Sequence, residues 1–250
     1  MTARRVLWLG LLALVVSGCT LVAAAPPREP PRAEPPPLVQ ADPDAERLAQ
    51  VRPATLARDS AERQARKMTV RVRNTGCEGV ATGSAFALDR HTLITNRHVL
   101  AGADELELDT WDGTALSVSS ASVGRIVDLG IVTTAAALPG VGHYGPRAPD
   151  GAEVAVVGYP LGGPLTITKG TVVDRVDGDR FGIPGDVMRM TARVEPGNSG
   201  GPVLNAKGEI VGVVFAIEIA TRLALAIPVD TLKSLVARGG LQDIPACGSE

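Results

Sequence analysis

The chain has 250 residues and a formal net charge of −2, because 25 lysines and arginines face 27 aspartates and glutamates. A chain without a basic excess lacks the electrostatic field that draws proteins to nucleic acid. The three histidines and three cysteines form no pair at metal-ligand spacing and no C-x-x-C motif, so zinc and dithiol redox sites have no support. The sequence therefore predicts a protein that works without a metal or organic cofactor.

The N-terminus has the pattern of a secretory signal peptide. Two arginines precede an apolar run at residues 6–16, which is short for a membrane span but suits the core of a signal. The run leads into Val-Ser-Gly-Cys, a sequence similar to a bacterial lipobox, so we expect residues 1–19 to be a lipoprotein signal with lipid attached to Cys19. The alternative is ordinary cleavage after the alanines at 23–25. Either processing places the protein on the extracytoplasmic side of a bacterial membrane, in the envelope or periplasm, and the lipobox would anchor it there.

The next two segments contain no group that suggests chemistry. Residues 20–43 are rich in proline, which favours extended polyproline geometry and cannot build a core. Residues 44–67 are charged and alanine-rich, which predicts a partly helical linker that Pro53 interrupts. We interpret the two segments as a tether that holds a folded domain away from a membrane.

With Cys19 assigned to the lipid, Cys77 and Cys247 remain as an even pair. In an oxidising compartment such a pair usually forms a disulfide, and both cysteines lie in loop-like sequence. The alternative is two free, buried thiols. The predicted bridge would join the front of the folded domain to its tail.

Residues 68–245 have the texture of an all-β domain. Short apolar runs alternate with glycine, proline, aspartate and asparagine, as expected for a sandwich or barrel of short strands. One helix is predicted near the end, with Asp230 capping residues 231–238 and Gly239 ending it. The clearest predicted strands are 84–88, 92–95, 105–108, 153–157 and 209–215.

Ser199 lies in the motif Pro-Gly-Asn-Ser-Gly-Gly-Pro, which is the strongest chemical signal in the chain. Glycines on both sides of a serine allow a tight turn without Cβ clashes, so that backbone N–H groups can converge on one point. Gly197 and Ser199 would then donate the two hydrogen bonds of an oxyanion hole. The alternative is a plain glycine-rich hairpin turn.

His98 and Asp128 are the predicted partners of this serine. His98 follows a predicted strand on a short turn or helix, where a neutral imidazole can accept the serine proton and return it to a leaving amine. Asp128 is a lone acid among apolar residues at the start of another strand, and it would hold the His98 tautomer. The other histidines and the other acids between His98 and Ser199 lie in polar loops or turns and are expected to be solvated: His91, His143, Asp104, Asp109, Asp112, Asp174, Asp177 and Asp179.

The same serine also fits G-x-S-x-G, the nucleophile elbow of α/β-hydrolases. That family places its histidine after the serine, whereas all three histidines of this chain precede Ser199. The subtilisin order of Asp, His and Ser could be met by Asp89, but the subtilisin serine opens a helix. Ser199 instead leads through Gly-Gly-Pro into a predicted strand.

Taken together, the motifs resemble the trypsin-like serine peptidases of the chymotrypsin fold over residues 68–240. The resemblance is closest to the compact bacterial branch of HtrA and actinobacterial acid-resistance periplasmic proteases. It implies two packed antiparallel β-barrels with a short C-terminal helix, and a His98–Asp128–Ser199 triad in the crevice between the barrels. The matching stretches are Thr82-Gly83-Ser84-Ala85-Phe86, Thr95-Asn96-Arg97-His98-Val99, Asp128-Leu129-Gly130-Ile131-Val132, Gly158-Tyr159-Pro160-Leu161-Gly162 and Gly197-Asn198-Ser199-Gly200-Gly201-Pro202.

The sequence departs from the family pattern at several positions. Asn198 replaces the aspartate that pairs with a new N-terminus in digestive enzymes, so zymogen activation of that kind is not expected. Ala85 replaces a more usual glycine, and Arg97 replaces a small residue beside the histidine. The peptide-binding PDZ module common in HtrA proteins is not expected.

The resemblance implies an endopeptidase acting on proteins or peptides through an acyl-enzyme on Ser199. It also implies a substrate pocket lined by Val194, Phe215, Ala216 and Ile217, which would favour a small or aliphatic side chain before the scissile bond. The alternative is a catalytically silent lipoprotein that keeps the fold as a peptide-binding or adaptor module. Retention of all three triad residues and of the glycines favours the enzyme.

Overall fold

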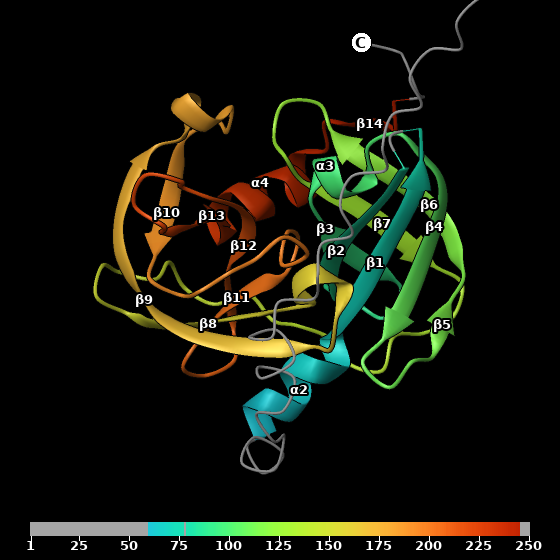
Figure 1. Ribbon diagram of the computed structural model, residues 1–250, viewed down its shortest axis with the longest axis horizontal. Helices are drawn as coiled ribbons and strands as arrows, with labels where there is room; N and C mark the ends of the chain where they lie inside the picture. The colour runs from blue at the N-terminus through green and yellow to red at the C-terminus, as the bar shows by residue number, and fades with distance from the viewer. Residues whose placement is uncertain (1–59, 78, 246–250) are drawn as a thin grey trace, which may run out of the picture. The chain divides into compact units, whose positions relative to one another are not determined.

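The computed structural model describes residues 60–77 and 79–245, which form a mostly β structure built around two sheets (Figure 1). The predicted all-β fold with one short C-terminal helix is confirmed. The expected signal peptide, Cys19, the proline-rich tether and Cys247 lie outside the described residues, so the predictions about them stay predictions.

The first sheet has eight strands, and every pairing in it is antiparallel. Its strand order is β14-β6-β7-β3-β2-β1-β4-β5, so the C-terminal β14 and the two-residue β5 form its edges. The sheet is therefore open, although the resemblance implies a barrel here. Its strands are β1 (Thr69–Gly76), β2 (Gly79–Ala87), β3 (Thr92–Thr95), β4 (Ala103–Thr110), β5 (Ala115–Leu116), β6 (Val118–Gly124), β7 (Gly130–Thr134) and β14 (Leu241–Asp243).

The second sheet closes into a six-stranded barrel in the order β10-β13-β12-β11-β8-β9. Bulges interrupt β9–β10, β11–β12 and β12–β13, and such bulges bend strands and increase their twist. The strands are β8 (Glu153–Gly158), β9 (Thr166–Asp177), β10 (Asp186–Met190), β11 (Pro202–Asn205), β12 (Ile210–Ile217) and β13 (Ala224–Pro228).

The buried apolar side chains form two clusters. The larger one draws buried side chains from both sheets, including Phe86 and Ile94 from the first and Leu204 and Ile210 from the second. The smaller cluster lies in the closed barrel around Met188 and Met190. Because the larger cluster is shared, the two sheets pack as one body, and residues from each can meet at one site.

Helices and short turns complete the structure. They are α2 (Ser60–Met68), α3 (Arg97–Leu100), η2 (Pro160–Gly162), η3 (Gly178–Phe181) and α4 (Val229–Arg238). None of the described helices is long and apolar enough to cross a membrane.

The C-terminal helix α4 begins earlier than the sequence predicts. Pro228 occupies the N-cap, and no side chain caps the helix there, so the prediction that Asp230 is the cap is wrong. Proline fixes the extended φ that the N-cap needs, and Asp230 falls inside the first turn, where a carboxylate interacts favourably with the helix dipole. The helix ends at Gly239, as predicted.

Candidate functional site

His98 and Asp128 form a two-point contact next to the paired strands β3 and β7 of the first sheet. His98 lies on α3, which follows β3, and Asp128 lies just before β7. The His98 ring nitrogen Nδ1 lies 2.7 Å from Asp128 Oδ2, and the His98 backbone N–H donates to Asp128 Oδ1 over 2.9 Å. The same carboxylate therefore fixes both the backbone and the ring of the histidine. The predicted pairing of His98 with Asp128 is present in the structure.

The residues around this pair explain why the chain folds this way locally. The strand β3 ends at Thr95, and the buried Asn96 begins α3, which carries His98. Asn96 Nδ2 donates to the Asp128 carbonyl over 2.8 Å, which ties the loop before β7 to the start of α3. The Asp128 side chain is only 19% exposed, while the His98 side chain is 48% exposed.

Ser199 comes from the closed barrel and reaches the same region. Its carbonyl oxygen accepts a hydrogen bond from the Ser84 backbone over 2.8 Å, which crosses from one sheet to the other. The next residue, Gly200, has φ +83, and a methyl group there would lie 2.1 Å from the Ser84 carbonyl oxygen and 3.1 Å from the Asn96 nitrogen. Only glycine fits this close approach, which brings Ser199 next to the segment that leads into His98.

The Ser199 hydroxyl is weakly engaged. Its Oγ lies 3.5 Å from the Phe215 carbonyl oxygen, a distance beyond the usual range for a hydroxyl hydrogen bond. Among the residues that the structure describes, no hydrogen bond joins this Oγ to the His98 ring. Rotation about one side-chain bond redirects a serine hydroxyl, and such contacts are often loose before a substrate binds.

The backbone before Ser199 forms a turn that orients the Gly197 N–H. Asn198 N–H donates to the Glu195 carbonyl over 3.0 Å, and Gly197 has φ +98, which is the pattern of a type II turn with Pro196 in its second position. The Pro196 carbonyl oxygen accepts from Leu161 N–H over 2.6 Å. Because a trans peptide is planar, the Gly197 N–H points to the side opposite Leu161.

The same argument applies to the Ser199 N–H. The Asn198 carbonyl oxygen accepts from Gly201 N–H over 2.9 Å, so the Ser199 N–H on the same peptide points the other way. Neither the Gly197 nor the Ser199 N–H donates to an acceptor within residues 60–77 and 79–245. The hydrogen bonds to the Pro196 and Asn198 carbonyls therefore orient the two N–H groups that were predicted as oxyanion donors. Neither N–H group is used by another group among the described residues.

Ser84, on β2 of the first sheet, contacts the turn before Ser199 and was not among the site residues predicted from the sequence. Its buried hydroxyl donates to the Gly197 carbonyl over 2.7 Å and accepts from Tyr159 N–H over 3.0 Å. The signal was present, since Ser84 and Tyr159 both lie in stretches that match the family. Their roles depend on a contact between segments 75 residues apart, which no local pattern reveals.

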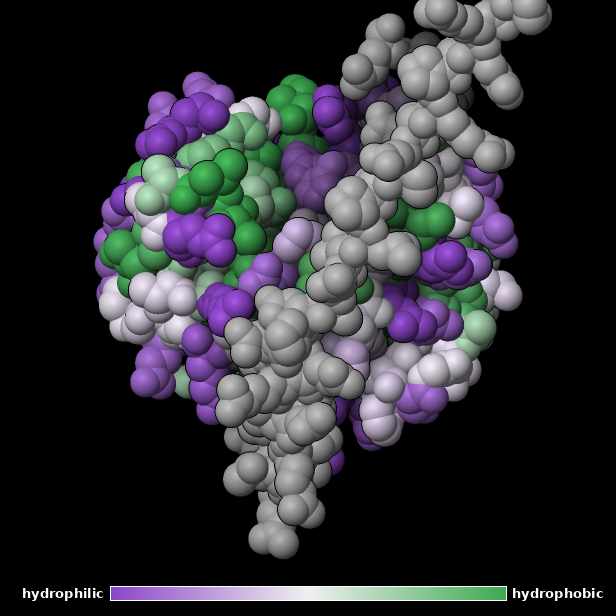
Figure 2. All heavy atoms as spheres, viewed as in Figure 1, coloured by the Kyte–Doolittle hydropathy of each residue, from purple (hydrophilic) through white to green (hydrophobic). Residues whose placement is uncertain are grey.

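The four residues predicted to line a substrate pocket are only partly brought together. Val194 lies in the smaller apolar cluster and Ile217 packs against it, whereas Phe215 and Ala216 pack with the larger cluster. The bulge between Val214 and Ala216 causes this division, because it shifts the side-chain alternation along β12. Hydrophobic side chains also appear on the visible face of the closed barrel (Figure 2).

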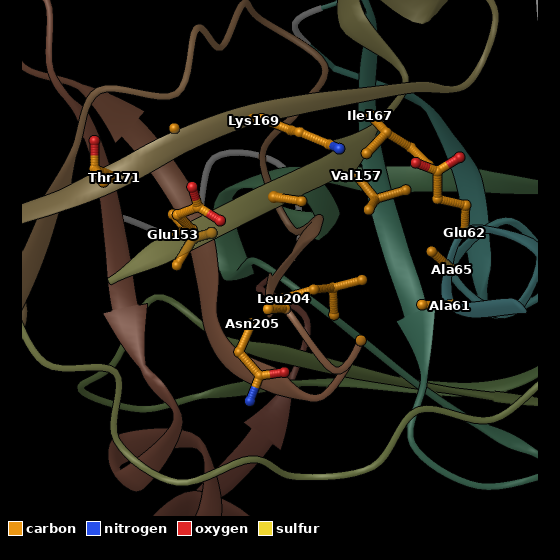
Figure 3. Close-up of a pocket in the computed structure, with 15 residues that line it drawn as sticks. Ala61, Glu62, Ala65, Glu153, Val157, Ile167, Lys169, Thr171, Leu204 and Asn205 are labelled. Atoms are coloured by element: carbon orange, nitrogen blue, oxygen red, sulfur yellow. The ribbon is translucent and has the colours of Figure 1, made fainter. Parts of the chain in front are cut away.

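A cavity of about 550 Å³ lies away from this site, between α2 and the closed barrel. Apolar side chains of β8, β9 and β11 line it, with Glu62 reaching in from α2 and Lys169 from β9 (Figure 3). None of its lining residues belongs to the predicted triad, so the cavity is separate from the candidate active site.

The sequence matches the trypsin-like peptidase domain family over residues 83–213. It is 30% identical to the serine protease Rv3671c of Mycobacterium tuberculosis over 151 residues, which cover 57% of this chain and 38% of the relative. It is 34% identical to the serine protease Do-like HtrA of Bacillus subtilis over 133 residues, covering 48% and 29% of the two chains. The chain thus spans less than half the length of the curated relatives that it matches.

Solved structures give the same picture of the fold. The active form of the Rv3671c protease superposes with a TM-score of 0.68 at 26% identity, covering 78% of this chain and 92% of that one. An inactive form of the same protease gives 0.64 at 26% identity, covering 76% and 96%. The arrangement of the two sheets is therefore that of the chymotrypsin-like fold.

Proposed function

Because this chain belongs to the trypsin-like peptidase family, we propose that it is a serine endopeptidase with His98, Asp128 and Ser199 as its catalytic triad. The observation that carries the proposal is the two-point contact between His98 and Asp128, next to a serine whose turn leaves two backbone donors free. A plain hairpin turn would not need a partly buried acid that fixes a nearby histidine.

The chemistry follows from the roles of these groups. Ser199 Oγ attacks the carbonyl carbon of a peptide bond, and His98 Nε2 takes the hydroxyl proton. The Gly197 and Ser199 N–H groups stabilise the resulting oxyanion. His98 then returns the proton to the leaving amine as the C–N bond breaks, and water hydrolyses the acyl-enzyme by the same steps.

The backbone hydrogen bonds of this turn support an oxyanion hole that is formed before substrate binds. The carbonyls of Pro196 and Asn198 are each bound on the side opposite the donor N–H of the same peptide. A preformed hole is worth several kcal/mol in a transition state because no reorganisation is needed during the reaction.

We propose that the pocket before the scissile bond accepts a small or aliphatic side chain. Val194 lies in the smaller apolar cluster, and Ile217 packs against it. The substrate class is proteins or peptides. Cleavage of a peptide library mainly after lysine or arginine would contradict this specificity.

We also propose that the protein is held on the extracytoplasmic side of a membrane by a lipid at Cys19 and carries a Cys77–Cys247 disulfide. Both proposals rest on the sequence patterns described above. Metabolic labelling with an alkyne palmitate analogue tests the anchor, and labelling should be lost in Cys19→Ser. If Cys19→Ser labels as well as the wild type, the lipid is not on this cysteine.

A fluorophosphonate probe tests the proposed activity. Such a probe reacts with a serine only when a base activates it, so the full-length protein should label and Ser199→Ala should not. Ser119→Ala, which changes an exposed serine on β6, is the matched control and should label normally. A folded wild-type protein that does not label would favour the silent peptide-binding module.

A further inference from the structure

The short turn η2 contacts both the first sheet and the turn at residues 195–198, which we call the oxyanion turn. Its central residue Leu161 has φ +53 although it is not glycine, and its side chain is mostly exposed at 65%. A left-handed leucine costs free energy and persists only where surrounding contacts hold it. The exposed side chain does not supply those contacts, so the backbone must.

The backbone contacts of η2 go in two directions. Toward the closed barrel, Leu161 N–H donates to the Pro196 carbonyl over 2.6 Å, which is the bond that orients Gly197 N–H. Toward the first sheet, the Gly162 carbonyl accepts from Arg71 Nη1 over 3.3 Å, and a methyl group on Gly162 would touch Thr82 at 3.2 Å. The turn therefore connects the first sheet to the oxyanion hole.

Arg71 is itself held by an acid on the neighbouring strand. Arg71 on β1 faces Asp109 on β4 in the strand register, and Arg71 Nη2 donates to Asp109 Oδ2 over 2.7 Å. A guanidinium has several donors in a fixed plane, so one can bind the carboxylate while another binds a carbonyl. The Arg71 side chain is only 38% exposed, compared with 49% for Arg73 two residues along.

We propose that Arg71 is a positioning residue for the oxyanion hole, acting through the Gly162 carbonyl, the left-handed Leu161 and the Pro196 carbonyl. Without the Arg71 contact, Leu161 relaxes from its left-handed conformation and its N–H leaves Pro196. The Pro196–Gly197 peptide is then free to rotate, and the Gly197 N–H no longer points into the hole. This inference rests on the proposed peptidase function.

Arg73 provides a matched control in the same element. It faces Glu107 in the register of β1 and β4, and Arg73 Nη1 binds Glu107 Oε2 over 3.0 Å. The two arginines thus make the same kind of cross-strand ion pair. Arg71 differs because its guanidinium also donates to the Gly162 carbonyl of η2. A general effect of losing a surface ion pair should be equal for both.

The experiment compares Arg71→Met, Arg71→Lys and Arg73→Met in the full-length protein, with kcat and KM measured on a peptide that the wild type cleaves. Removing an oxyanion donor outright lowers kcat by about 10²–10³-fold, so partial loss of its orientation should lower kcat by about 10-fold in Arg71→Met. KM should stay within about 2-fold, because the donors act mainly in the transition state. Arg71→Lys should recover part of the loss, since an ammonium can bind one acceptor.

Arg73→Met should keep the wild-type kcat, and thermal unfolding should give the same small change for both methionine variants. Equal kcat for Arg71→Met and Arg73→Met would overturn the proposal, as would a fall in kcat that tracks a fall in melting temperature. These results require an active wild type. Failure of the peptidase function itself would show separately, as a wild type that neither labels with the probe nor cleaves peptides.

Discussion

At the scale of single residues, the candidate site is a set of backbone groups whose hydrogen bonds are almost all accounted for. The carbonyl oxygens of Pro196, Gly197, Asn198 and Ser199 each accept a bond, from Leu161, Ser84, Gly201 and Ser84 in turn. Buried carbonyls rarely stay unpaired, so this turn has little freedom to adopt another conformation. The donors that remain, Gly197 and Ser199 N–H, are the ones that the chemistry needs.

Replacement of Asp128 by asparagine should nearly abolish activity without unfolding the protein. The amide oxygen can still accept from the His98 backbone N–H, but its NH₂ would then face Nδ1 and favour the ring tautomer with a proton on Nε2. That tautomer cannot take a proton from Ser199, so we expect kcat to fall by about 10⁴-fold. Circular dichroism checks the fold, and Asp104→Asn, an exposed acid, is the control. Near-normal turnover by Asp128→Asn would remove Asp128 from the triad.

Replacement of Ser84 by alanine should affect stability and catalysis together. The Gly197 carbonyl and the Tyr159 N–H both lose their partner, which costs about 1–3 kcal/mol for buried groups. Because the Gly197–Asn198 peptide also loosens, kcat should fall by about 10-fold. Chemical denaturation and steady-state kinetics measure the two effects. An unchanged kcat with reduced stability would show that Ser84 is purely structural.

At the scale of elements, α2 belongs to the folded body although the sequence places the start of the domain at residue 68. Ala65 on α2 is 3% exposed, and Met68 at its end is fully buried in the larger apolar cluster. The Thr69 hydroxyl donates to the Ala65 carbonyl, and the Gln64 amide donates to the Val141 carbonyl, so the helix is tied to the start of β1 and to the segment between β7 and β8. A domain cut at residue 68 would lose these contacts.

This predicts a large cost for truncating the buried end of α2. Met68→Ala removes a side chain from a packed core and should lower the free energy of unfolding by about 2–5 kcal/mol. Lys67→Ala, at the adjacent exposed position, should change it by less than about 0.5 kcal/mol. Urea denaturation of the full-length proteins gives both values, and equal values would mean that α2 does not pack on the sheet in solution.

The ion pairs of Arg189, on β10, should make the stability of the protein depend on pH. Arg189 donates to both oxygens of Asp174, which lowers the pKa of Asp174, and hydrogen bonds from Thr221 and Arg189 lower the pKa of Glu218. A carboxyl whose pKa is lower in the folded state stabilises the protein above its unfolded pKa. That stability is lost as the pH falls below the ordinary values of 3.8 and 4.5.

Arg189→Met should therefore unfold at a higher pH than the wild type in an acid titration. Its matched control is Arg193→Met, because Arg193 is largely exposed and its recorded ion pair is to Glu195 alone. Circular dichroism against pH measures the midpoint for each. The same acid midpoint in all three proteins would show that the Arg189 contacts do not contribute to folding stability.

At the scale of the whole molecule, much of the fold was predictable because its signals are local. Alternating short strands, the stop at Gly239 and the strand after Pro202 follow from residue preferences within a few positions. The pairing of His98 with Asp128 was predicted from their settings and their order in the chain, together with the family resemblance.

The rest was not predictable because it depends on contacts between distant segments. The sequence does not show that Leu161 is left-handed, and the turn around it also bonds to distant segments, through Leu161 N–H to Pro196 and through the Gly162 carbonyl to Arg71. The hydrogen bonds of the Ser84 hydroxyl and the open edges of the first sheet likewise arise only once the chain has folded. The sequence thus predicted which residues would carry the proposed chemistry, whereas their positioning could be described only from the assembled structure.

In the proposed mechanism, Ser199 forms an acyl-enzyme with the help of His98. The most direct measurement is intact-protein mass spectrometry after mixing the full-length protein with a peptide ester and quenching in acid, followed by mapping of the modified peptide. We expect one added acyl group located on Ser199, absent in Ser199→Ala and slow to form in His98→Ala. An acyl group on another residue, or ester turnover that persists undiminished in Ser199→Ala, would contradict it.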